Sequence, residues 1–239
     1  MILDIDIGNT RVKWRLSAEQ GEIVAIGAVA HNRDLAGVDL LSGLPQVSRV
    51  RVVSVVEPVA AQIGEQCERH WSIIPEVAAV ADGCGGVRCG YEHPERLGVD
   101  RWLGIVAAWA RCRCACLVVS AGSALTIDII DGAGVHKGGY ILPGLRMMAD
   151  ALGSKTWGIN VDVPVAPTLL PGKTTSEAVM HGSLVALVGA VERVAAGAQI
   201  RKLFLTGGDA ALVQKSLSIQ SDVEVVSGLV LDGLSVALP

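Results

Sequence analysis

The segment Ile2-Leu-Asp-Ile-Asp-Ile-Gly-Asn-Thr10 opens the chain with alternating apolar and acidic residues and then breaks at a glycine. Strict alternation is typical of a half-buried β-strand, and the Gly-Asn pair that follows is typical of a turn. The pattern continues, because Arg11–Leu16 alternates again and Glu22–Ala30 predicts a third strand after a turn at Gly21. We therefore expect the chain to begin as a β-meander.

The same architecture returns near residue 115. A strand is predicted over Ala115–Ser120, a tight turn over Ala121–Ala124, a second strand over Leu125–Ile130 and a third over Val135–Ile141. The repeat is one of architecture and has no strict sequence period. It indicates that the chain contains two similar halves.

Hydrophobic periodicity and the positions of glycine and proline predict the other elements. They are strands over Arg49–Val56, Lys202–Thr206 and Val223–Val226, and helices over Val59–His70, Trp102–Cys112, Leu145–Leu152, Ser176–Ala196 and Ala210–Leu217. With the repeat, they predict an α/β fold of two similar lobes, residues 1–113 and 114–239, with a cleft between them.

The composition limits the kinds of partner that we expect for the protein. The chain has 239 residues, a formal charge of −4 and only 3% aromatic residues. It has no basic excess and no basic run interleaved with rings, which argues against a nucleic-acid-binding protein. The longest uncharged runs, near Cys114–Ile127 and Ala178–Val191, are about fourteen residues long and fall short of a membrane span. Because Asp4 and Asp6 also argue against a secretory signal, we expect a cytoplasmic protein whose partners are small molecules.

Three of the six cysteines form the run Cys112-Arg-Cys-Ala-Cys116. Zinc sites use paired C-x-x-C spacing, which this C-x-C-x-C run lacks. A chain of this length can bury an adequate core without disulfide bonds. We therefore expect reduced, buried or half-buried thiols and no zinc site.

Three glycine-containing turns at predicted strand ends are candidates for nucleotide contact. In Asp6-Ile-Gly-Asn-Thr10, Gly8 lets the backbone turn and approach a bound group, the following amides offer donors to phosphate oxygens, and Asp6 offers a ligand to hydrated magnesium. Ser120–Ala124 is the counterpart in the second lobe, and Leu205-Thr-Gly-Gly-Asp209 offers backbone to an adenine-ribose unit. Each turn alone is compatible with an ordinary turn, but together they predict a nucleotide cleft.

Asp100 is the best candidate for a catalytic base. Phosphoryl transfer needs in-line positioning, charge neutralisation and a group that accepts the hydroxyl proton. Asp100 precedes Arg101 at a predicted junction of loop and helix, where helix amides and the guanidinium would keep the carboxylate ionised. The alternative is that Asp100 only caps the helix. Arg101 either holds a carboxylate or amide of the substrate or orients Asp100.

A set of motifs, in order and over almost the whole chain, resembles type III pantothenate kinase. They are Asp6-Ile-Gly-Asn-Thr10, Tyr91, Gly98-Val-Asp-Arg101, Ala121-Gly-Ser-Ala-Leu-Thr-Ile-Asp128, Gly138-Gly-Tyr-Ile-Leu-Pro-Gly144, Thr175-Ser-Glu-Ala178 and Leu205-Thr-Gly-Gly-Asp209. The resemblance implies two ribonuclease H-like lobes with mixed sheets flanked by helices. It also implies ATP-dependent phosphorylation of pantothenate at its primary hydroxyl, the first step of coenzyme A synthesis. Magnesium, a monovalent cation (K⁺ or NH₄⁺) and a homodimer are implied as well.

The resemblance further implies the contacts of individual residues. Those implied to contact ATP are Asp6, Ile7, Gly8, Asn9, Thr10, Arg11, Val12, Lys13, Ser123, Gly207 and Gly208. Those implied to contact pantothenate are Tyr91, Gly98, Val99, Asp100, Arg101 and Thr175, the last from the partner subunit. From the sequence alone, Tyr91 would be an ordinary loop aromatic and Thr175 a helix cap.

Ser120 departs from the family pattern, because the family has at this position an aspartate that is associated with the monovalent cation. A neutral oxygen in place of a carboxylate predicts weak dependence on potassium or ammonium. Asp128 either compensates in part or is an ordinary strand carboxylate. Two alternatives stay open: a catalytically weak, ligand-binding regulatory homologue, and a kinase of the same superfamily for a different hydroxyl substrate.

Overall fold

The structure, a computed structural model, describes residues 1–35, 37–159, 161, 165–219 and 222–239. They form two compact units: the first unit is Met1–Ala110 with Gly228–Pro239, and the second unit is Arg111–Ser227. The units differ from the predicted lobes 1–113 and 114–239 mainly at the C-terminal end. Helix α6 (Leu229–Ala237) belongs to the first unit because it packs on strands β1 and β4.

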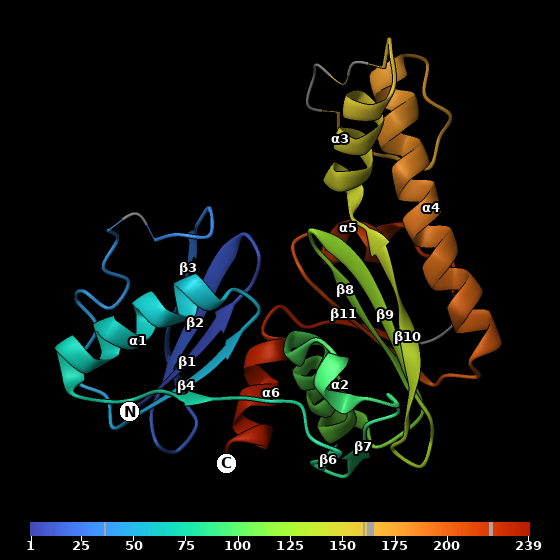
Figure 1. The fold of residues 1–239 in the computed structure, drawn as a ribbon. Helices are drawn as coiled ribbons and strands as arrows, with labels where there is room; N and C mark the ends of the chain where they lie inside the picture. The colour runs from blue at the N-terminus through green and yellow to red at the C-terminus, as the bar shows by residue number, and fades with distance from the viewer. Residues whose placement is uncertain (36, 160, 162–164, 220–221) are drawn as a thin grey trace. The chain divides into compact units, whose positions relative to one another are not determined.

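The first unit contains a five-stranded mixed sheet in the order β3-β2-β1-β4-β5 (Figure 1). The strands are β1 (Ile2–Ile7), β2 (Arg11–Ser17), β3 (Ile23–Ala30), β4 (Arg49–Ser54) and β5 (Glu76–Val77). The first three pair antiparallel, as expected for a meander, while β4 runs parallel to β1 and β5 parallel to β4.

Alternation along β1 gives this sheet two chemically different faces. The apolar residues of β1 pack with helix α1 (Glu57–Trp71) in the core of the unit. They are Leu3, Ile5 and Ile7 on β1, with Val59, Ile63 and Cys67 on α1. The acidic residues Asp4 and Asp6 therefore belong to the opposite face, on which the candidate site is built.

Ion pairs attach the last helix to this second face. Asp4 is buried and pairs with Arg15 of β2 and Arg51 of β4. Arg15 also pairs with Asp232 of α6, and Arg51 donates to the backbone oxygen of Leu238. The network explains why the C-terminal residues belong to the unit that contains the N-terminus.

The second unit repeats the strand order of the first. Its sheet runs β10-β9-β8-β11-β12, with β8, β9 and β10 antiparallel and the parallel strands on the other side. The elements are β8 (Cys116–Ala121), β9 (Ala124–Ile130), β10 (His136–Pro143), β11 (Lys202–Thr206), β12 (Asp222–Val225), α3 (Leu145–Lys155), α4 (Thr175–Gly197) and α5 (Ala210–Ser216). The predicted fold class, two α/β lobes with mixed sheets flanked by helices, is confirmed.

Some elements of the first unit differ from the sequence prediction. Helix α2 (Val99–Cys112) begins before the predicted Trp102, so that Asp100 lies in its first turn. A hairpin of β6 (Gly83–Cys84) and β7 (Val87–Arg88) and a short 3-10 helix over Pro94–Arg96 lie in a stretch predicted as loop. These elements, like α6 and β5, are short and lack a periodic pattern, so tertiary contacts decide their formation.

Helix α4 is, within the described part of the chain, the one helix long and apolar enough to cross a membrane. In the second unit it packs against α3 and contributes Leu184, Leu187 and Val191 to the hydrophobic core. Of its most apolar window, 39% is buried. A core helix of a globular protein has the same properties, so this helix is weak evidence for a membrane span.

Candidate active site

Asp6 lies near the end of β1, where its strand partner across β2 is Lys13. It is only 9% exposed. Burial raises the pKa of this carboxyl from 3.8 to about 6; the charge of Lys13 lowers it, and the charge of Asp100 raises it. Asp6, Lys13 and Asp100 are therefore close enough for their charges to act on one another. The structure brings the predicted magnesium ligand and the predicted base together in the first unit.

The turn after β1 presents exposed side chains. Asn9, Thr10 and Arg11 are exposed, and the Gly8 amide donates to the Arg11 carbonyl at 3.0 Å. A ring nitrogen of His31 donates to the Gly8 carbonyl at 2.8 Å.

Gly8 itself is not required by this turn, contrary to the sequence prediction. Its φ lies outside the left-handed region, and a Cβ built on it would make only an ordinary 3.4 Å contact with the Arg11 oxygen. What the glycine leaves is open space beside the backbone, which suits the close approach of a ligand.

Asp100 is held in place by the helix that it begins. It lies in the first turn of α2, and its Oδ1 accepts a hydrogen bond of 2.8 Å from the Arg101 amide. A Cβ on Gly98 would lie 2.8 Å from this oxygen, so the carboxylate needs a glycine there. Asp100 is not the N-cap of the alternative interpretation, because it lies inside the helix; its contact with the Arg101 amide fixes a partly exposed carboxylate beside Asp6.

Arg101 and Tyr91 form a second pair within the same segment. A guanidinium N–H of Arg101 donates to the Tyr91 hydroxyl at 2.9 Å, and the guanidinium carbon lies 5.6 Å from the centre of the ring. Arg101 is buried. Tyr91 is therefore not an ordinary loop aromatic, because it is tied to the helix that carries Asp100. Within the first unit, the predicted substrate-contacting residues form one cluster.

The turn after β8 in the second unit resembles the turn after β1. Ser120 lies in the last part of β8, and the Gly122 amide donates to the Ala124 carbonyl at 3.0 Å, as the Gly8 amide does to Arg11. Ser123 is exposed, and its carbonyl accepts from the Gly144 amide. The predicted second phosphate turn is thus built like the first.

The Gly207-Gly208 segment packs directly on the end of β8. Gly207 has a φ of 95°, and a Cβ there would lie 2.2 Å from the Ala121 oxygen. The Asp209 amide donates to that same oxygen at 3.0 Å. A Cβ on Gly208 would meet no atom within 4 Å. The three predicted nucleotide-binding residues of this unit, Ser123, Gly207 and Gly208, therefore surround one strand end.

Sequence reasoning did not single out two residues beside these turns, Asp209 and Arg146. Burial raises the pKa of Asp209, and the charge of Arg146 lowers it, so the guanidinium of α3 is near this carboxylate. The signal was available, since Arg146 follows Gly144 at the start of a predicted helix and Asp209 ends the Leu205–Asp209 motif.

The family model for type III pantothenate kinase matches residues 2–197. The chain belongs to this family. Type III pantothenate kinases of Chromohalobacter salexigens, Marinobacter nauticus and Ectopseudomonas mendocina are 39%, 37% and 38% identical to it. The matches cover 92%, 98% and 100% of this chain and 81%, 96% and 99% of those proteins. The predicted family and enzyme class, pantothenate kinase, are confirmed.

Solved structures support the fold alone. The activator of 2-hydroxyisocaproyl-CoA dehydratase from Clostridium difficile, solved with ADPNP, is similar with a TM-score of 0.55 and 13% identity, over 99% of this chain and 92% of that one. A ROK family glucokinase from Streptomyces griseus, solved with glucose and AMPPNP, has a TM-score of 0.52 and 14% identity, over 98% and 97%. The pantothenate kinase thus shares its fold with kinases of other substrates.

Thr175 of this pantothenate kinase is not the helix cap that the sequence alone suggested. Thr174 caps α4: its hydroxyl accepts from the Glu177 amide, and the Glu177 carboxylate accepts from the Thr174 amide. Thr175 is the first residue of the helix and is exposed. Because the neighbouring threonine does the capping, the Thr175 hydroxyl is not needed for the helix start.

Asp128 is engaged within the core of the second unit. It is 1% exposed, and its Oδ1 lies 2.9 Å from Nε2 of the buried His136. Ser120 faces Thr126 across the strand pair, whereas Asp128 faces Val118. The interpretation of Asp128 as a strand carboxylate is therefore the one that the geometry favours.

The residues of the first unit suit a magnesium ion that substrate phosphates and water also bind. They suit less well a metal ion that protein side chains alone would hold. The described residues contain no group of three or more His, Cys, Asp or Glu side chains that could hold a metal. Magnesium, however, is usually held by one or two carboxylates together with substrate phosphates and water. Asp6, close to Asp100, provides such a partial site.

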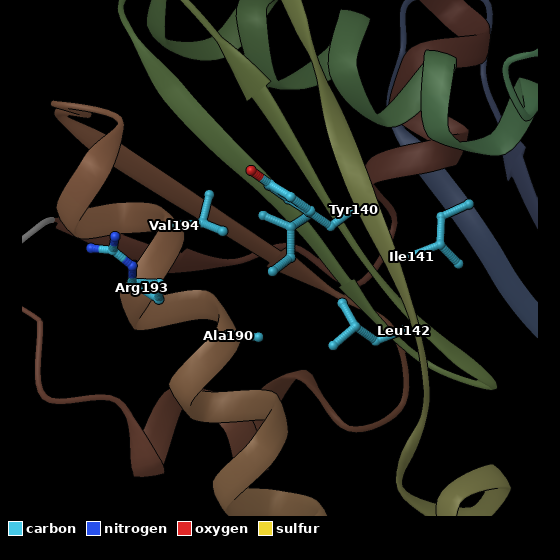
Figure 2. Close-up of a pocket in the computed structure, with 7 residues that line it drawn as sticks. Tyr140, Ile141, Leu142, Ala190, Arg193 and Val194 are labelled. Carbon is cyan, nitrogen blue, oxygen red and sulfur yellow. The ribbon is translucent and has the colours of Figure 1, made fainter.

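A separate cavity of about 350 Å³ lies between β9, β10 and α4 in the second unit (Figure 2). It is lined by Ile127, Tyr140, Ile141, Leu142, Ala190, Arg193 and Val194. In the close-up, Tyr140 extends toward Val194 of α4, while Ile141 points the other way (Figure 2). The cavity includes none of the predicted site residues and is mostly apolar, so it is not the nucleotide site.

Proposed function

We propose that this chain transfers the γ-phosphoryl group of ATP to the primary hydroxyl of pantothenate, the first step of coenzyme A biosynthesis, in the cytoplasm. The observation that carries the proposal is the placement of Asp6, Asp100, Arg101 and Tyr91 in one cluster of the first unit. Membership of the type III pantothenate kinase family supports it and favours an enzyme over the regulatory alternative.

Asp100 is the proposed base. In phosphoryl transfer the protein mainly positions the reactants and accepts the hydroxyl proton. The Arg101 amide holds the carboxylate in the first turn of α2. The Arg101 amide contacts Asp100, and its guanidinium donates to the Tyr91 hydroxyl. We assign Arg101 and Tyr91, with Gly98 and Val99, to pantothenate contact.

The exposed turns are the proposed ATP contacts. In the first unit these are the turn residues Gly8–Thr10 with the adjoining strand residues Ile7 and Arg11–Lys13, of which Ile7 and Val12 are buried, and in the second Ser123, Gly207 and Gly208. Asp6 would hold hydrated Mg²⁺, which neutralises phosphate charge when it is bound. A pKa of about 6 leaves Asp6 mostly ionised at neutral pH, as this role requires.

We propose weak dependence on monovalent cations. Ser120 offers a neutral oxygen, and Asp128 lies in hydrogen-bond contact with His136, so we do not expect this carboxylate to compensate for the serine. The measurement is ADP release in sodium and then in ammonium or potassium buffer. A strong rate increase with either ion would contradict this part of the proposal.

The test of the main proposal is pantothenate-dependent ADP release by the purified protein with Mg-ATP. Asp100→Asn should lower turnover about a hundredfold or more while ATP affinity changes little. Glu95→Gln is the matched control, since Glu95 lies in the same segment and is exposed. Near-normal turnover of Asp100→Asn would remove Asp100 from this role. No turnover of the folded, pantothenate-binding wild type would favour the regulatory alternative.

A homodimer in which the partner contributes Thr175 is also proposed. Large apolar side chains of the second unit are exposed, among them Tyr140 at 53%, Ile141 at 65% and Val185 at 49%, which suits coverage by a second copy. If sites are shared, mixing equal amounts of the inactive Asp100→Asn and Thr175→Val proteins should restore about a quarter of the wild-type rate. About half of the dimers are then mixed, and each mixed dimer has one intact site of two. A mixture that stays inactive although mixed dimers form would contradict this arrangement.

A further inference from the structure

Three thiols gather where α2 leads into β8. Cys112 is the last residue of α2, Cys116 is the first residue of β8, and Cys114 lies in the bend between them. All three are free, and Cys112 and Cys114 are partly exposed while Cys116 is buried. None of the three belongs to the proposed kinase site.

The side chain of Cys112 contacts both of the other thiols. Its thiol donates to the backbone oxygen of Cys114 over 3.5 Å. It is also in hydrogen-bond contact with the side chains of Cys114 and Cys116. Arg113, between the first two cysteines, has a φ of 47°, in the left-handed region that residues other than glycine adopt at a cost. The turn thus holds Cys112 and Cys114 side by side.

The surroundings assign different roles to the sulfurs. Burial, together with contact to Cys112, raises the pKa of the Cys114 and Cys116 thiols, so both keep their protons and can donate them to Cys112. Arg201 and Lys202 place positive charge next to Cys114. Cys112 is partly exposed and contacts both other thiols, so we assign it as the sulfur that attacks an oxidant, with a neighbouring thiol to follow.

We propose that Cys112 and Cys114 form a reversible redox site that a hydroperoxide converts into a disulfide. The Cys112 sulfur attacks a peroxide oxygen, the O–O bond breaks, and an alcohol leaves (water in the case of hydrogen peroxide). The Cys114 sulfur then displaces the hydroxyl group from the resulting sulfenic acid, and its thiol proton leaves with that hydroxyl as water. The two thiols lose two hydrogens, the peroxide is reduced, and a small thiol reductant reverses the reaction.

The geometry of the cluster is less consistent with a disulfide between Cys112 and Cys116, or with a metal site. Cys116 is buried, so an oxidant and a reductant reach Cys114 more easily. A metal is not favoured, because no group of three ligating side chains in the described ranges is arranged to hold one. A disulfide across so short a loop constrains the unfolded chain little, which suits a reversible modification better than a structural staple.

Trypsin offers a direct test, because it cleaves after Arg111 and Arg113 and so separates the two cysteines. The purified full chain is treated with hydrogen peroxide, free thiols are alkylated, and the digest is analysed by mass spectrometry without reduction. The expected product is the dipeptide Cys112-Arg113 linked by a disulfide to the peptide Cys114–Lys137. Dithiothreitol should abolish it.

Variants decide which sulfurs take part. Cys112→Ser and Cys114→Ser should abolish the linked product, while Cys116→Ser should retain it. Cys89→Ser is the matched control, because Cys89 is also partly exposed but lies outside the cluster; it should behave as wild type. A linked product that survives in Cys114→Ser, or one that forms no faster in the folded chain than in urea, would overturn the proposal. Absence of the linked product at peroxide concentrations that oxidise a free model thiol would also overturn the proposal. These readouts do not depend on kinase activity.

Discussion

Gly98 is the residue on which the position of the Asp100 carboxylate depends. A Cβ there would lie 2.8 Å from Oδ1 of Asp100. Gly98→Ala should therefore displace the carboxylate and lower kcat by about a hundredfold, since small misplacements of a catalytic group are costly. The thermal midpoint should change little. Gly64→Ala in α1 is the control, because a Cβ there meets open space, and its activity should equal that of the wild type.

Asp6 makes the stability of the protein depend on pH. Its pKa is 3.8 when unfolded and about 6 when folded, so between these values the folded state binds the extra proton. Stability therefore falls as pH rises from about 4 to about 6 and then stays level. Asp6→Asn removes this cost and should be more stable than wild type at pH 7, by up to about 3 kcal/mol.

Urea unfolding of both proteins at several pH values would measure this difference. The variant should lose its advantage near pH 4, where the Asp6 carboxyl is neutral in both states. An advantage that does not vary with pH would contradict the assignment. Turnover should respond differently, because Asp6→Asn also removes the proposed magnesium ligand and should be nearly inactive.

The sequence predicted the structural setting of some candidate residues better than their contacts. The motif around Asp100 predicted a carboxylate near a helix start, and Asp100 lies in the first turn of α2; its role as a base stays a prediction. The proximity of Asp6 to Asp100 joins segments that are distant in the chain, and the hydrogen bond between Arg101 and Tyr91 closes a loop of ten residues. No local pattern encodes such distances, because the sheet and the packing of α2 set them.

At the level of elements, the two adjacent threonines at the start of α4 are expected to have different roles. Thr174 stabilises the helix, and Thr175 is the proposed contact to pantothenate. Thr174 forms both halves of the capping box with Glu177. Thr174→Ala should therefore lower the free energy of unfolding by about 1 kcal/mol. Thr175→Ala should leave stability unchanged and lower activity if the hydroxyl contacts pantothenate. Urea unfolding and steady-state kinetics of both variants would check this, and the reverse pattern would exchange their roles.

The ion pairs under α6 should dominate the stability of the first unit. Asp4 is buried between Arg15 and Arg51. Asp4→Asn removes the carboxylate from the buried Arg51 and one of the two carboxylates that pair with Arg15, which should cost about 3–5 kcal/mol. Glu19→Gln is the control, because Glu19 is exposed and its pairing is weak. Equal stabilities of the two variants in urea would show that the network is not needed.

Element prediction succeeded where periodicity was long. The strands of both meanders and the helices α1, α3 and α4 have clear alternating or helical patterns. In contrast, α6 contains Gly233 and only nine residues, and the hairpin of β6 and β7 is rich in glycine. Such segments fold because of what they pack against, so a local pattern could not predict them.

At the scale of the whole molecule, two units with the same strand order account for the repeated sequence pattern. The predicted boundary near residue 113 lies close to the observed one at Ala110. The assignment of residues 228–239 to the first unit could not be predicted, because it depends on Asp232 and on the close packing of Gly233 against the Leu103 backbone. Sequence order alone places these residues with the second half.

Deleting residues 228–239 should therefore destabilise the first unit and spare the second. The deletion removes α6 from β1 and β4 and leaves Arg15 without Asp232. Calorimetry should show loss of the transition that belongs to the first unit, and hydrogen exchange should increase in β1 and β2 while β8 and β9 stay protected. Equal loss of protection in both units would contradict this division.

The division of the chain also bears on its synthesis. The second unit is one continuous stretch, whereas the first is made of the two ends of the chain. A ribosome that synthesises the chain from its N-terminus therefore makes most of the first unit early but completes it last, after Gly228–Pro239 has emerged. The second unit can fold as soon as Ser227 is free. Until residues 228–239 have emerged, the early strands are exposed to chaperones and proteases, so these residues determine when the first unit becomes resistant.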